Sequence, residues 1–188
     1  MTLISKTVGA IVREQAKQFP NVEAYVYPEH GIRKTYAEFD QETDELAKAY
    51  MGMGIQKGEH VAIWSDNKRQ WLLSQYATGK MGATLVTVNT NYQTAELEYL
   101  LQQSESTTLI LDASYKGTSY IDIVKELCPE LAQSSKGELQ CAKLPHLKRI
   151  ILMTEQQEVG MFTWSELLQF AQKVTAEELE ERLQSLDP

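Results

Sequence analysis

Three glycines beside a lysine, Gly52, Gly54 and Gly58 with Lys57, have the residue types of a loop that binds nucleotide phosphates. In a dinucleotide-binding loop a strand precedes the glycines and a helix follows them, so that N–H groups at the start of the helix face the pyrophosphate. Here the order is reversed, because the helical pattern TYAEFDQETDELAKAYM precedes the glycines and the strand-like run HVAIW follows them. The pattern predicts that Gly52 or Gly54 ends a helix in the left-handed conformation and that Gly58 lies in the turn into the strand.

Two cysteines and three histidines could serve thiol or metal chemistry. Their spacing indicates neither a disulfide framework nor closely spaced metal ligands. Cys141 and His146 form the nearest pair, but a zinc site would need two further ligands, and a catalytic pair would need contact in space. We therefore expect structural thiols at Cys128 and Cys141, and no catalytic or metal-ligating residue in the chain.

Asp66 and Asp112 follow two expected strands, where open α/β sheets often carry ligand groups, and a carboxylate there could accept a phosphoryl group. Asp66 with Asn67 better suits the start of the next helix, and Asp112 better suits a turn outside an apolar strand. We expect these capping and turn roles. Lys80 could contact a phosphate, but it lies near a helix C-terminus, where the helix dipole already favours a cation.

The tryptophans could line an apolar pocket. Large aromatic side chains in strands and on helix faces more often pack in the core. We therefore expect core packing for Trp64, Trp71 and Trp164.

The best polar candidate for a site is the segment TVNTNYQTAELEYL. Asn89, Asn91 and Tyr92 lie between the end of a strand and the start of a helix, a position at which binding residues collect. The needs of a turn alone also explain these residue types, and better. We take Asn89, Asn91 and Tyr92 as the candidate polar surface of a site and leave the turn interpretation open beside it.

An amphipathic helix and a hairpin are expected at the start of the chain. The apolar residues between positions 8 and 19 share one helical face that seeks a partner surface, and Pro20 stops the helix. The segment EAYVYPEHGIRKTY contains two extended runs around a turn, which predict a β-hairpin. Thr35 and Glu38 then form a capping box for the next helix.

Strands and helices alternate after this point. The strand-like runs VAIW, TLVTV and TTLIL begin at Val61, Thr84 and Thr107, and the helix-like segments NKRQWLLSQYATGKM and TAELEYLLQQS lie between them. This alternation predicts parallel strands joined by helices. The expected fold class is α/β, with a mainly parallel sheet flanked by helices and with an N-terminal helix and β-hairpin attached.

The last third of the chain continues this pattern. A helix YIDIVKELC is followed by AQSSKGELQCAKLPH, which we expect to be the longest surface loop, and by the strand LKRIILM. Thr163 with Glu166 and Thr175 with Glu178 predict two capped helices. The second of these carries a leucine stripe made of Leu179, Leu183 and Leu186.

Composition excludes several classes of partner. The chain has 188 residues, 43% of them hydrophobic, which allows one domain of ordinary size with a core of its own. Its 18 basic and 26 acidic residues give a net charge of -8, which opposes binding to nucleic acids and to anionic lipid surfaces. No apolar run approaches the roughly 20 residues of a membrane span, so we expect a cytoplasmic protein.

The order of several short phrases resembles the N-terminal part of the adenylate-forming ligases, and above all the fatty-acyl-CoA synthetases. YMGMGIQKGEHVAIWS is similar to their passage of helix, Gly-Ile, Lys-Gly and strand, and GKMGATLVTVNTNYQTAELEYLL is similar to their Gly-Ala strand, Asn-containing turn and following helix. FTWSELL resembles a later family phrase, so that the resemblance covers about residues 5–172. It implies an incomplete N-terminal subdomain at 1–172 and, at 173–188, a terminal helix and the start of a connection to a catalytic portion.

The resemblance implies a two-step, AMP-forming ligase. ATP and a carboxylic acid, of fatty type, would give an acyl-adenylate and pyrophosphate, and the thiol of CoA would then displace AMP. The phosphate loop, the adenine and ribose contacts, the magnesium ligand and the C-terminal lysine of the family have no match before the final SLDP. We therefore expect this part to bind no cofactor and to be inactive by itself, whereas the parent ligase would use ATP, Mg and CoA.

Two alternatives remain beside this expectation. The chain could be an autonomous α/β binding or interaction module, or the N-terminal part of another carboxylate-adenylating ligase, such as one for aryl acids. Its expected partners are the remainder of the parent ligase and, in that parent, the acid and CoA. We also expect self-association as a homodimer or larger oligomer through the apolar stripe of the first helix or that of Leu179, Leu183 and Leu186.

Overall fold

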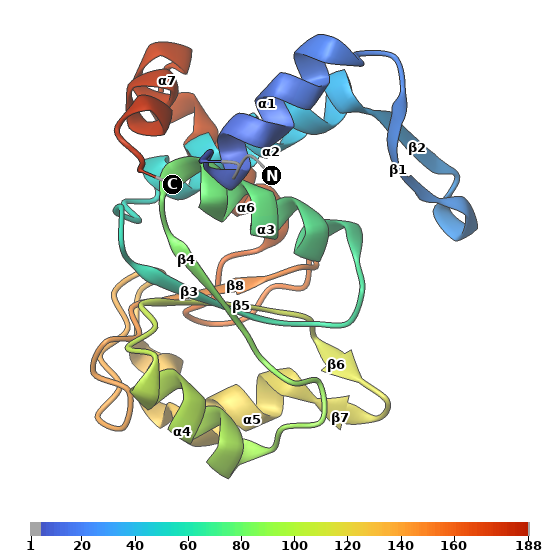
Figure 1. Cartoon of the computed structure of the whole chain (residues 1–188). Helices are drawn as coiled ribbons and strands as arrows, with labels where there is room; N and C mark the ends of the chain where they lie inside the picture. The colour runs from blue at the N-terminus through green and yellow to red at the C-terminus, as the bar shows by residue number, and fades with distance from the viewer. Residues whose placement is uncertain (1–4, 188) are drawn as a thin grey trace. The chain divides into compact units, whose positions relative to one another are not determined.

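A computed structural model describes residues 5–187, which form two compact units. The first unit comprises the described residues up to Lys57, the segment Leu72–Ala83 and the residues from Leu168 onward. The second comprises Gly58–Trp71 and Thr84–Leu167. Figure 1 labels the helices and strands of both units. No helix in the described part of the chain combines the length and the apolar character that crossing a membrane requires.

A four-stranded parallel sheet organises the second unit. Its strands are β3 (His60–Trp64), β4 (Thr84–Thr87), β5 (Thr108–Leu111) and β8 (Arg149–Leu152), in the order β4-β3-β5-β8. All three neighbouring pairs are parallel, as the alternating pattern predicted. The chain runs from β3 outward to β4 and then returns across β3 to β5, so the topological switch point lies between β3 and β5.

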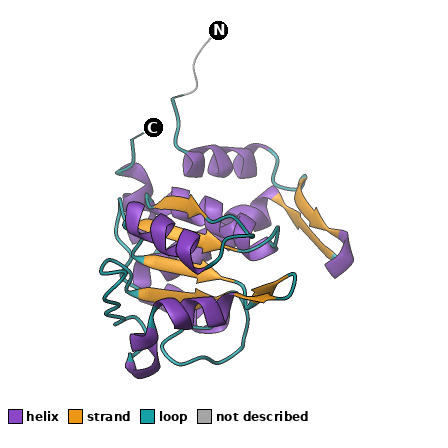
Figure 2. Cartoon of the chain, turned by 90° about the horizontal axis from the view of Figure 1, so that it is seen from below, coloured by secondary structure: helices purple, strands orange, loops and turns teal. Residues whose placement is uncertain are grey.

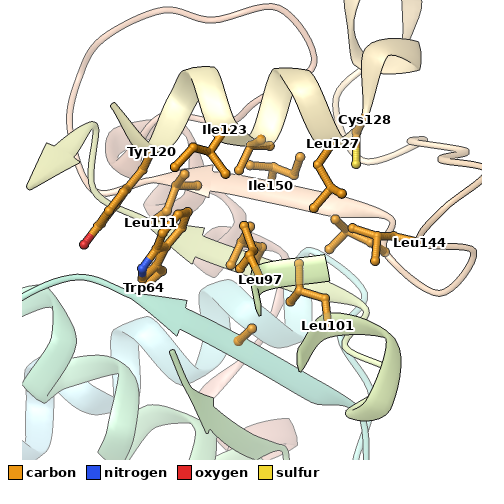
Figure 3. Packing of buried hydrophobic residues seen from close by; sticks show 14 of the residues in the cluster. Trp64, Leu97, Leu101, Leu111, Tyr120, Ile123, Leu127, Cys128, Leu144 and Ile150 are labelled. Carbon is orange, nitrogen blue, oxygen red and sulfur yellow. The ribbon is translucent and has the colours of Figure 1, made fainter. Parts of the chain in front are cut away.

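Helices α4 (Thr94–Gln103) and α5 (Tyr120–Leu127) cover one face of this sheet (Figure 1). They bury Leu97 and Leu101 from α4 and Ile123 and Leu127 from α5 in one hydrophobic cluster with the strands (Figure 3). Every residue of β5 is buried. A strand covered in this way needs a continuous apolar run rather than an alternating one, which explains the sequence TLIL.

Two features of the second unit differ from expectation. The segment after α5 forms the 3-10 helix Pro129–Gln133 and then an irregular loop, but Leu139, Cys141 and Leu144 of this loop are buried in the cluster. Its polar residues suggested a surface loop, whereas its widely spaced apolar residues anchor it to the core. A short hairpin, β6 (Ser114–Tyr115) and β7 (Thr118–Ser119), was not predicted.

The first unit begins with α1 (Val8–Gln18) and a hairpin of β1 (Glu23–Tyr27) and β2 (Ile32–Thr35). The hairpin carries the 3-10 helix Pro28–His30 at its tip (Figure 2). Helix α2 (Tyr36–Gly52) starts with the predicted capping box, because Thr35 and Glu38 each accept a hydrogen bond from the other's backbone N–H. These elements confirm the N-terminal helix and hairpin.

Two helices begin in the second unit and continue into the first: α3 (Arg69–Met81) and α6 (Trp164–Gln169). The 3-10 helix Phe170–Lys173 and α7 (Ala176–Gln184) follow. The predicted capping boxes at Thr163 and Thr175 are both present. The proposed division of the chain at residue 172 stays a prediction.

The glycine-rich stretch ends helix α2. Gly54 has φ 90° and Gly58 has φ 84°, so both use the left-handed region, and Gly54 is the residue that turns the chain after the helix. Gly52 lies in the last turn of α2, where a Cβ atom would collide with the carbonyl oxygen of Phe170. Lys57 Nζ donates to the carbonyl oxygen of Ser185 at 2.6 Å. The stretch therefore serves backbone geometry, as predicted.

The leucine stripe of α7 is covered within the first unit. Leu179 is only 3% exposed, Leu183 lies beside Gly9, and Leu186 lies beside Gly82. These leucines thus have partners within the first unit, because two glycines without side chains let Leu183 and Leu186 approach closely, and self-association through the stripe stays a prediction. The apolar face of α1 is covered only in part, since Val12 and Ala16 are buried but Val8 is 49% exposed.

Candidate functional site

The candidate site lies at the carboxyl edge of the parallel sheet, where β3, β4 and β5 end. Ligands of open α/β sheets bind at this edge, close to the topological switch point. Two groups of residues occupy it. We call residues 89–92, which follow β4, the Asn turn, and we call Lys68 and Asp112, which follow β3 and β5, the switch-point pair.

The Asn turn brings together the three residues that the sequence singled out. Asn89 Oδ1 accepts a hydrogen bond from the backbone N–H of Asn91 at 2.9 Å, and the carbonyl oxygen of Asn89 accepts one from the N–H of Tyr92 at 3.1 Å. Asn91 is exposed, and the half-buried ring of Tyr92 packs against the core cluster. Asn89 therefore accepts the hydrogen bonds that form the turn, and the turn fixes the positions of the exposed Asn91 and the half-buried Tyr92.

Two stacked aromatic side chains of the core bind the backbone of this turn. The rings of Trp64 and Tyr120 lie 3.7 Å apart with an interplanar angle of 13°. Trp64 Nε1 donates a hydrogen bond to the carbonyl oxygen of Asn89 at 3.0 Å. The hydroxyl of Tyr120 donates one to the carbonyl oxygen of Thr90 at 2.7 Å. Figure 3 shows the indole nitrogen and the hydroxyl oxygen at the same end of the pair. The expected core packing of Trp64 is confirmed, with a polar contact in addition.

Sequence reasoning missed Tyr120, which it placed only within an expected helix. One signal was available, because a buried tyrosine hydroxyl nearly always has a hydrogen-bond partner. Burial, together with the smaller effects of the nearby Tyr115, Asp112 and Asp66, raises the pKa of Tyr120 to about 12. The hydroxyl therefore keeps its proton at neutral pH and remains a donor to Thr90.

The switch-point pair joins the two strands between which the topology reverses. Lys68 Nζ forms an ion pair with Asp112 Oδ2, and Asp112 Oδ1 accepts a hydrogen bond from the N–H of Ala113 at 2.9 Å. The Asp112 side chain is 8% exposed and that of Lys68 is 39% exposed. The turn role expected for Asp112 is present, but its carboxylate is also engaged by a cation. A phosphate approaching Lys68 would have to displace this carboxylate.

Asp66 differs from its expected role as a helix cap. Its Oδ1 atom is buried and has no hydrogen-bond partner among the described residues, so that atom does not cap α3. The carbonyl oxygen of Asp66 accepts hydrogen bonds from the N–H of Lys68 at 2.9 Å and from the hydroxyl of Ser65 at 3.0 Å. The backbone carbonyl of Asp66 therefore helps to shape the turn before α3.

Lys80 lies in the first unit and has partners other than the helix dipole. Its side chain is fully buried, and Nζ lies 2.6 Å from Asp40 Oδ1 and 2.6 Å from Asp44 Oδ1. Arg13 pairs with Asp44 at 2.7 Å on the same cluster. The structural role of Lys80 is confirmed, but its partners are two carboxylates of α2 rather than the helix dipole. Sequence spacing could not relate these carboxylates to Lys80.

The thiols are buried and lack the features of a reactive site. Cys128 and Cys141 are buried and free, and Cys141 Sγ lies 3.7 Å from the carbonyl oxygen of Leu127. Burial, with the neighbouring Cys141 thiol, raises the pKa of Cys128 above its ordinary value. A thiol of this kind is a poor nucleophile. Within residues 5–187, no group of three or more His, Cys, Asp or Glu side chains is arranged to hold a metal ion.

The remaining tryptophans agree with the core interpretation to different degrees. Trp164 is 8% exposed, whereas Trp71 is half-buried. Neither lies in the Asn turn or the switch-point pair. We interpret the tryptophans, the thiols and Lys80 as structural, so the carboxyl edge of the sheet remains the candidate site.

Comparison with known proteins gives one family match and several relatives. Residues 12–184 match the model of the AMP-binding enzyme family. The chain is 49% identical over 185 residues to YngI of Bacillus subtilis (strain 168), provisionally named an acyl-CoA synthetase, covering 98% of this chain and 34% of that protein. It is 35% identical over 167 residues to the mitochondrial medium-chain acyl-CoA ligase ACSF2 of Danio rerio, covering 89% of this chain and 27% of that protein. The chain thus spans about a third or less of these relatives.

Solved structures share the fold. The N-terminal domain of FACL13 from Mycobacterium tuberculosis aligns with a TM-score of 0.68 and 22% identity, over 92% of this chain and 38% of that chain. The anthranilate CoA ligase AuaEII, solved in complex with anthranoyl-AMP, aligns with a TM-score of 0.71 and 19% identity, over 89% of this chain and 29% of that chain. At these identities the structures support the α/β fold alone.

Proposed function

The chain belongs to the AMP-binding enzyme family, and from this premise we propose that it is part of an ATP-dependent acyl-CoA synthetase. The observation that carries the proposal is the 49% identity to YngI over 98% of the chain. The name of ACSF2 as an acyl-CoA ligase supports the same reaction class. The proposal rests on this sequence relationship and not on the chemistry of any single described side chain.

The proposed reaction has two steps. The acid's carboxylate attacks the α-phosphorus of ATP, which releases pyrophosphate and forms an acyl-adenylate, and the CoA thiol then attacks the acyl carbon and releases AMP. Activation is needed because a carboxylate is a poor acyl donor, whereas AMP is a good leaving group when its developing charge is stabilised by held donors.

The described residues 5–187 offer no group of three or more His, Cys, Asp or Glu side chains that could hold Mg²⁺ without substrate phosphates. At the carboxyl edge, Asp112 is already paired with Lys68. We therefore assign ATP, Mg and CoA binding to other residues of a longer ligase, and we expect this chain by itself to be inactive.

We assign to this chain one polar border of the ligase site, formed by the Asn turn. The Asn turn lies at the carboxyl edge of a parallel sheet, and Asn91 is exposed there. Residues 88–93 carry no charged side chain. The turn therefore suits hydrogen bonds to a neutral polar group of a substrate, or of the remaining protein, better than it suits a bare phosphate.

A fatty acid is the substrate class we favour, because ACSF2 is named as a medium-chain acyl-CoA ligase. The second candidate is an aryl acid, since AuaEII is named as an anthranilate CoA ligase. An autonomous binding module of the same fold is the alternative outside the ligases.

The decisive experiment measures acid-dependent exchange of labelled pyrophosphate into ATP. It compares this chain with a longer ligase that contains it, using fatty acids of short, medium and long chain and anthranilate, and it follows acyl-CoA formation after CoA is added. We expect exchange and acyl-CoA only with the longer protein and a fatty acid. Exchange by this chain alone would contradict the assignment of ATP binding to other residues, and a longer protein that adenylates no acid would reject the ligase proposal.

A further inference from the structure

The Asn turn follows an edge strand, so the sheet supports it from one side only. β4 pairs with β3 and has no strand on its other side in the four-stranded sheet. Beyond β4 the ladder gives one further bond, from the N–H of Val88 to the carbonyl oxygen of Ile63 at 2.9 Å. The conformation of the next residues must come from other contacts.

Those contacts come from two elements that are distant in the sequence. Trp64 ends β3 and Tyr120 begins α5, and their polar atoms bind consecutive carbonyl oxygens, those of Asn89 and Thr90. The stacked rings fix each other's orientation. Trp64 and Tyr120 are both fully buried, so neither donor can exchange its partner for water without opening the core.

We propose that Trp64 and Tyr120 are positioning residues, which hold the Asn turn so that Asn91 and Tyr92 keep the orientation used in the ligase reaction. The inference rests on the proposed function, because it takes the Asn turn as a border of the ligase site. Because both side chains are fully buried, we assign neither a direct contact with the substrate. They act through the backbone of the turn, and a small displacement of such a border lowers the rate because groups must be held close to their productive geometry.

The variant Tyr120→Phe tests the pair with little change in volume. It keeps the ring stacked on Trp64 but removes the donor to Thr90. Tyr50→Phe is the matched control, because the buried hydroxyl of Tyr50 makes one hydrogen bond of 2.8 Å, to Ser74 Oγ, and lies outside the second unit. Both variants lose one buried tyrosine hydroxyl, so both report the general cost of that loss in melting temperature.

The first readout is amide hydrogen exchange of this chain. The N–H groups of Asn91 and Tyr92 are bonded to Asn89, and we expect Tyr120→Phe to speed their exchange about tenfold or more while Tyr50→Phe leaves them unchanged, since opening free energies differ locally. Equal exchange in Tyr120→Phe and the wild type would overturn the proposal. Trp64→Phe, which removes the donor to Asn89, is expected to act in the same direction.

The second readout is kinetic and uses the longer ligase. We expect Tyr120→Phe to lower kcat/KM for acyl-CoA formation about tenfold, and Tyr50→Phe to leave it within about twofold of the wild type. An equal loss in both variants would show a general effect of stability and would reject a positioning role. A wild-type ligase that forms no acyl-CoA would overturn the proposed function, and the exchange rates would still decide whether the pair holds the turn.

Discussion

Lys80 Nζ lies 2.6 Å from Asp40 Oδ1, and the lysine side chain is fully buried while that of Asp40 keeps 16% exposure. The lysine also donates to the backbone oxygen of Asp40 at 2.9 Å. One ammonium group therefore satisfies both the side chain and the backbone of the same α2 residue. The carboxylates of Asp40 and Asp44 together compensate the charge of the buried ammonium, and Arg13 pairs with the same two carboxylates.

Removing this cation should leave two carboxylates short of a partner. We expect Lys80→Met to lower the free energy of unfolding by about 3 kcal/mol, since loss of one partner of a buried pair costs several kcal/mol while Arg13 still offsets part of the charge. Urea unfolding measures the change. Lys6→Met is the control, because Lys6 and Glu14 form a pair with side chains 48% and 51% exposed, and its loss should cost at most about 1 kcal/mol. Equal effects would contradict the burial argument.

The capping box of α2 should make stability depend on acid pH. The backbone N–H of Thr35 and then the ammonium of Lys34 lower the pKa of Glu38 from 4.5 to about 2. A lowered pKa in the folded state means that its contribution is fully present above 4.5 and is lost as the pH falls toward 2. We expect Glu38→Gln to flatten the stability curve across this window. An NMR titration that places the Glu38 carboxyl near 4.5 would show that the cap does not bind the carboxylate.

Substitution of alanine for Gly52 or Gly54 at the end of α2, or for Gly31 in the hairpin, should lower the free energy of unfolding by different amounts. Gly54→Ala should destabilise the fold by roughly 1 kcal/mol through left-handed strain, as should Gly31→Ala, whose added Cβ meets no atom within 4 Å. Gly52→Ala should cost more than about 2 kcal/mol, because its Cβ would collide with Phe170 O. Thermal unfolding ranks the three. A Gly54→Ala ligase with an unchanged melting temperature but weaker ATP binding would instead indicate a nucleotide loop.

The leucine stripe of α7 should behave as core. Leu179→Glu should lower the unfolding free energy by about 3 kcal/mol or more, because it places a carboxylate at a site that is 3% exposed, whereas Leu168→Glu, at a site 40% exposed, should change it by about 0.5 kcal/mol or less. Denaturant unfolding of both variants measures the difference. A Leu179→Glu chain as stable as the wild type would show that the stripe is free in solution.

Self-association, if it uses an apolar helix face, should therefore involve α1. Val8 and Ile11 are 49% and 37% exposed, and a face of this size is small beside the roughly 800 Å² per partner of a standard interface. We expect weak association that Ile11→Glu abolishes, measured by light scattering over a concentration series. A dimer that persists in Ile11→Glu would place the interface elsewhere.

Local sequence patterns were sufficient for the long helices, for the strands of the parallel sheet and for the Asn turn, but not for the short β6–β7 hairpin. Runs such as VAIW and TTLIL predicted buried parallel strands, the Thr-Glu spacing at Thr35 and Thr175 predicted two capping boxes, and the position of Asn89 between strand and helix predicted a turn. These features depend on residues within a few positions of one another, so their physical causes are visible in the sequence.

The tertiary structure decided the partners of the polar and apolar side chains. Lys80 pairs with Asp40 across 40 positions, Lys68 with Asp112 across 44, and Trp64 with the carbonyl oxygen of Asn89 across 25. Neither the burial of Leu139 nor the cover over Leu179 follows from composition. The sequence by itself determined which segments form strands, helices and caps, because backbone hydrogen bonding and apolar periodicity act locally. Only the strand order β4-β3-β5-β8 decided which side chains meet at the carboxyl edge, because that order brings the ends of separate segments together.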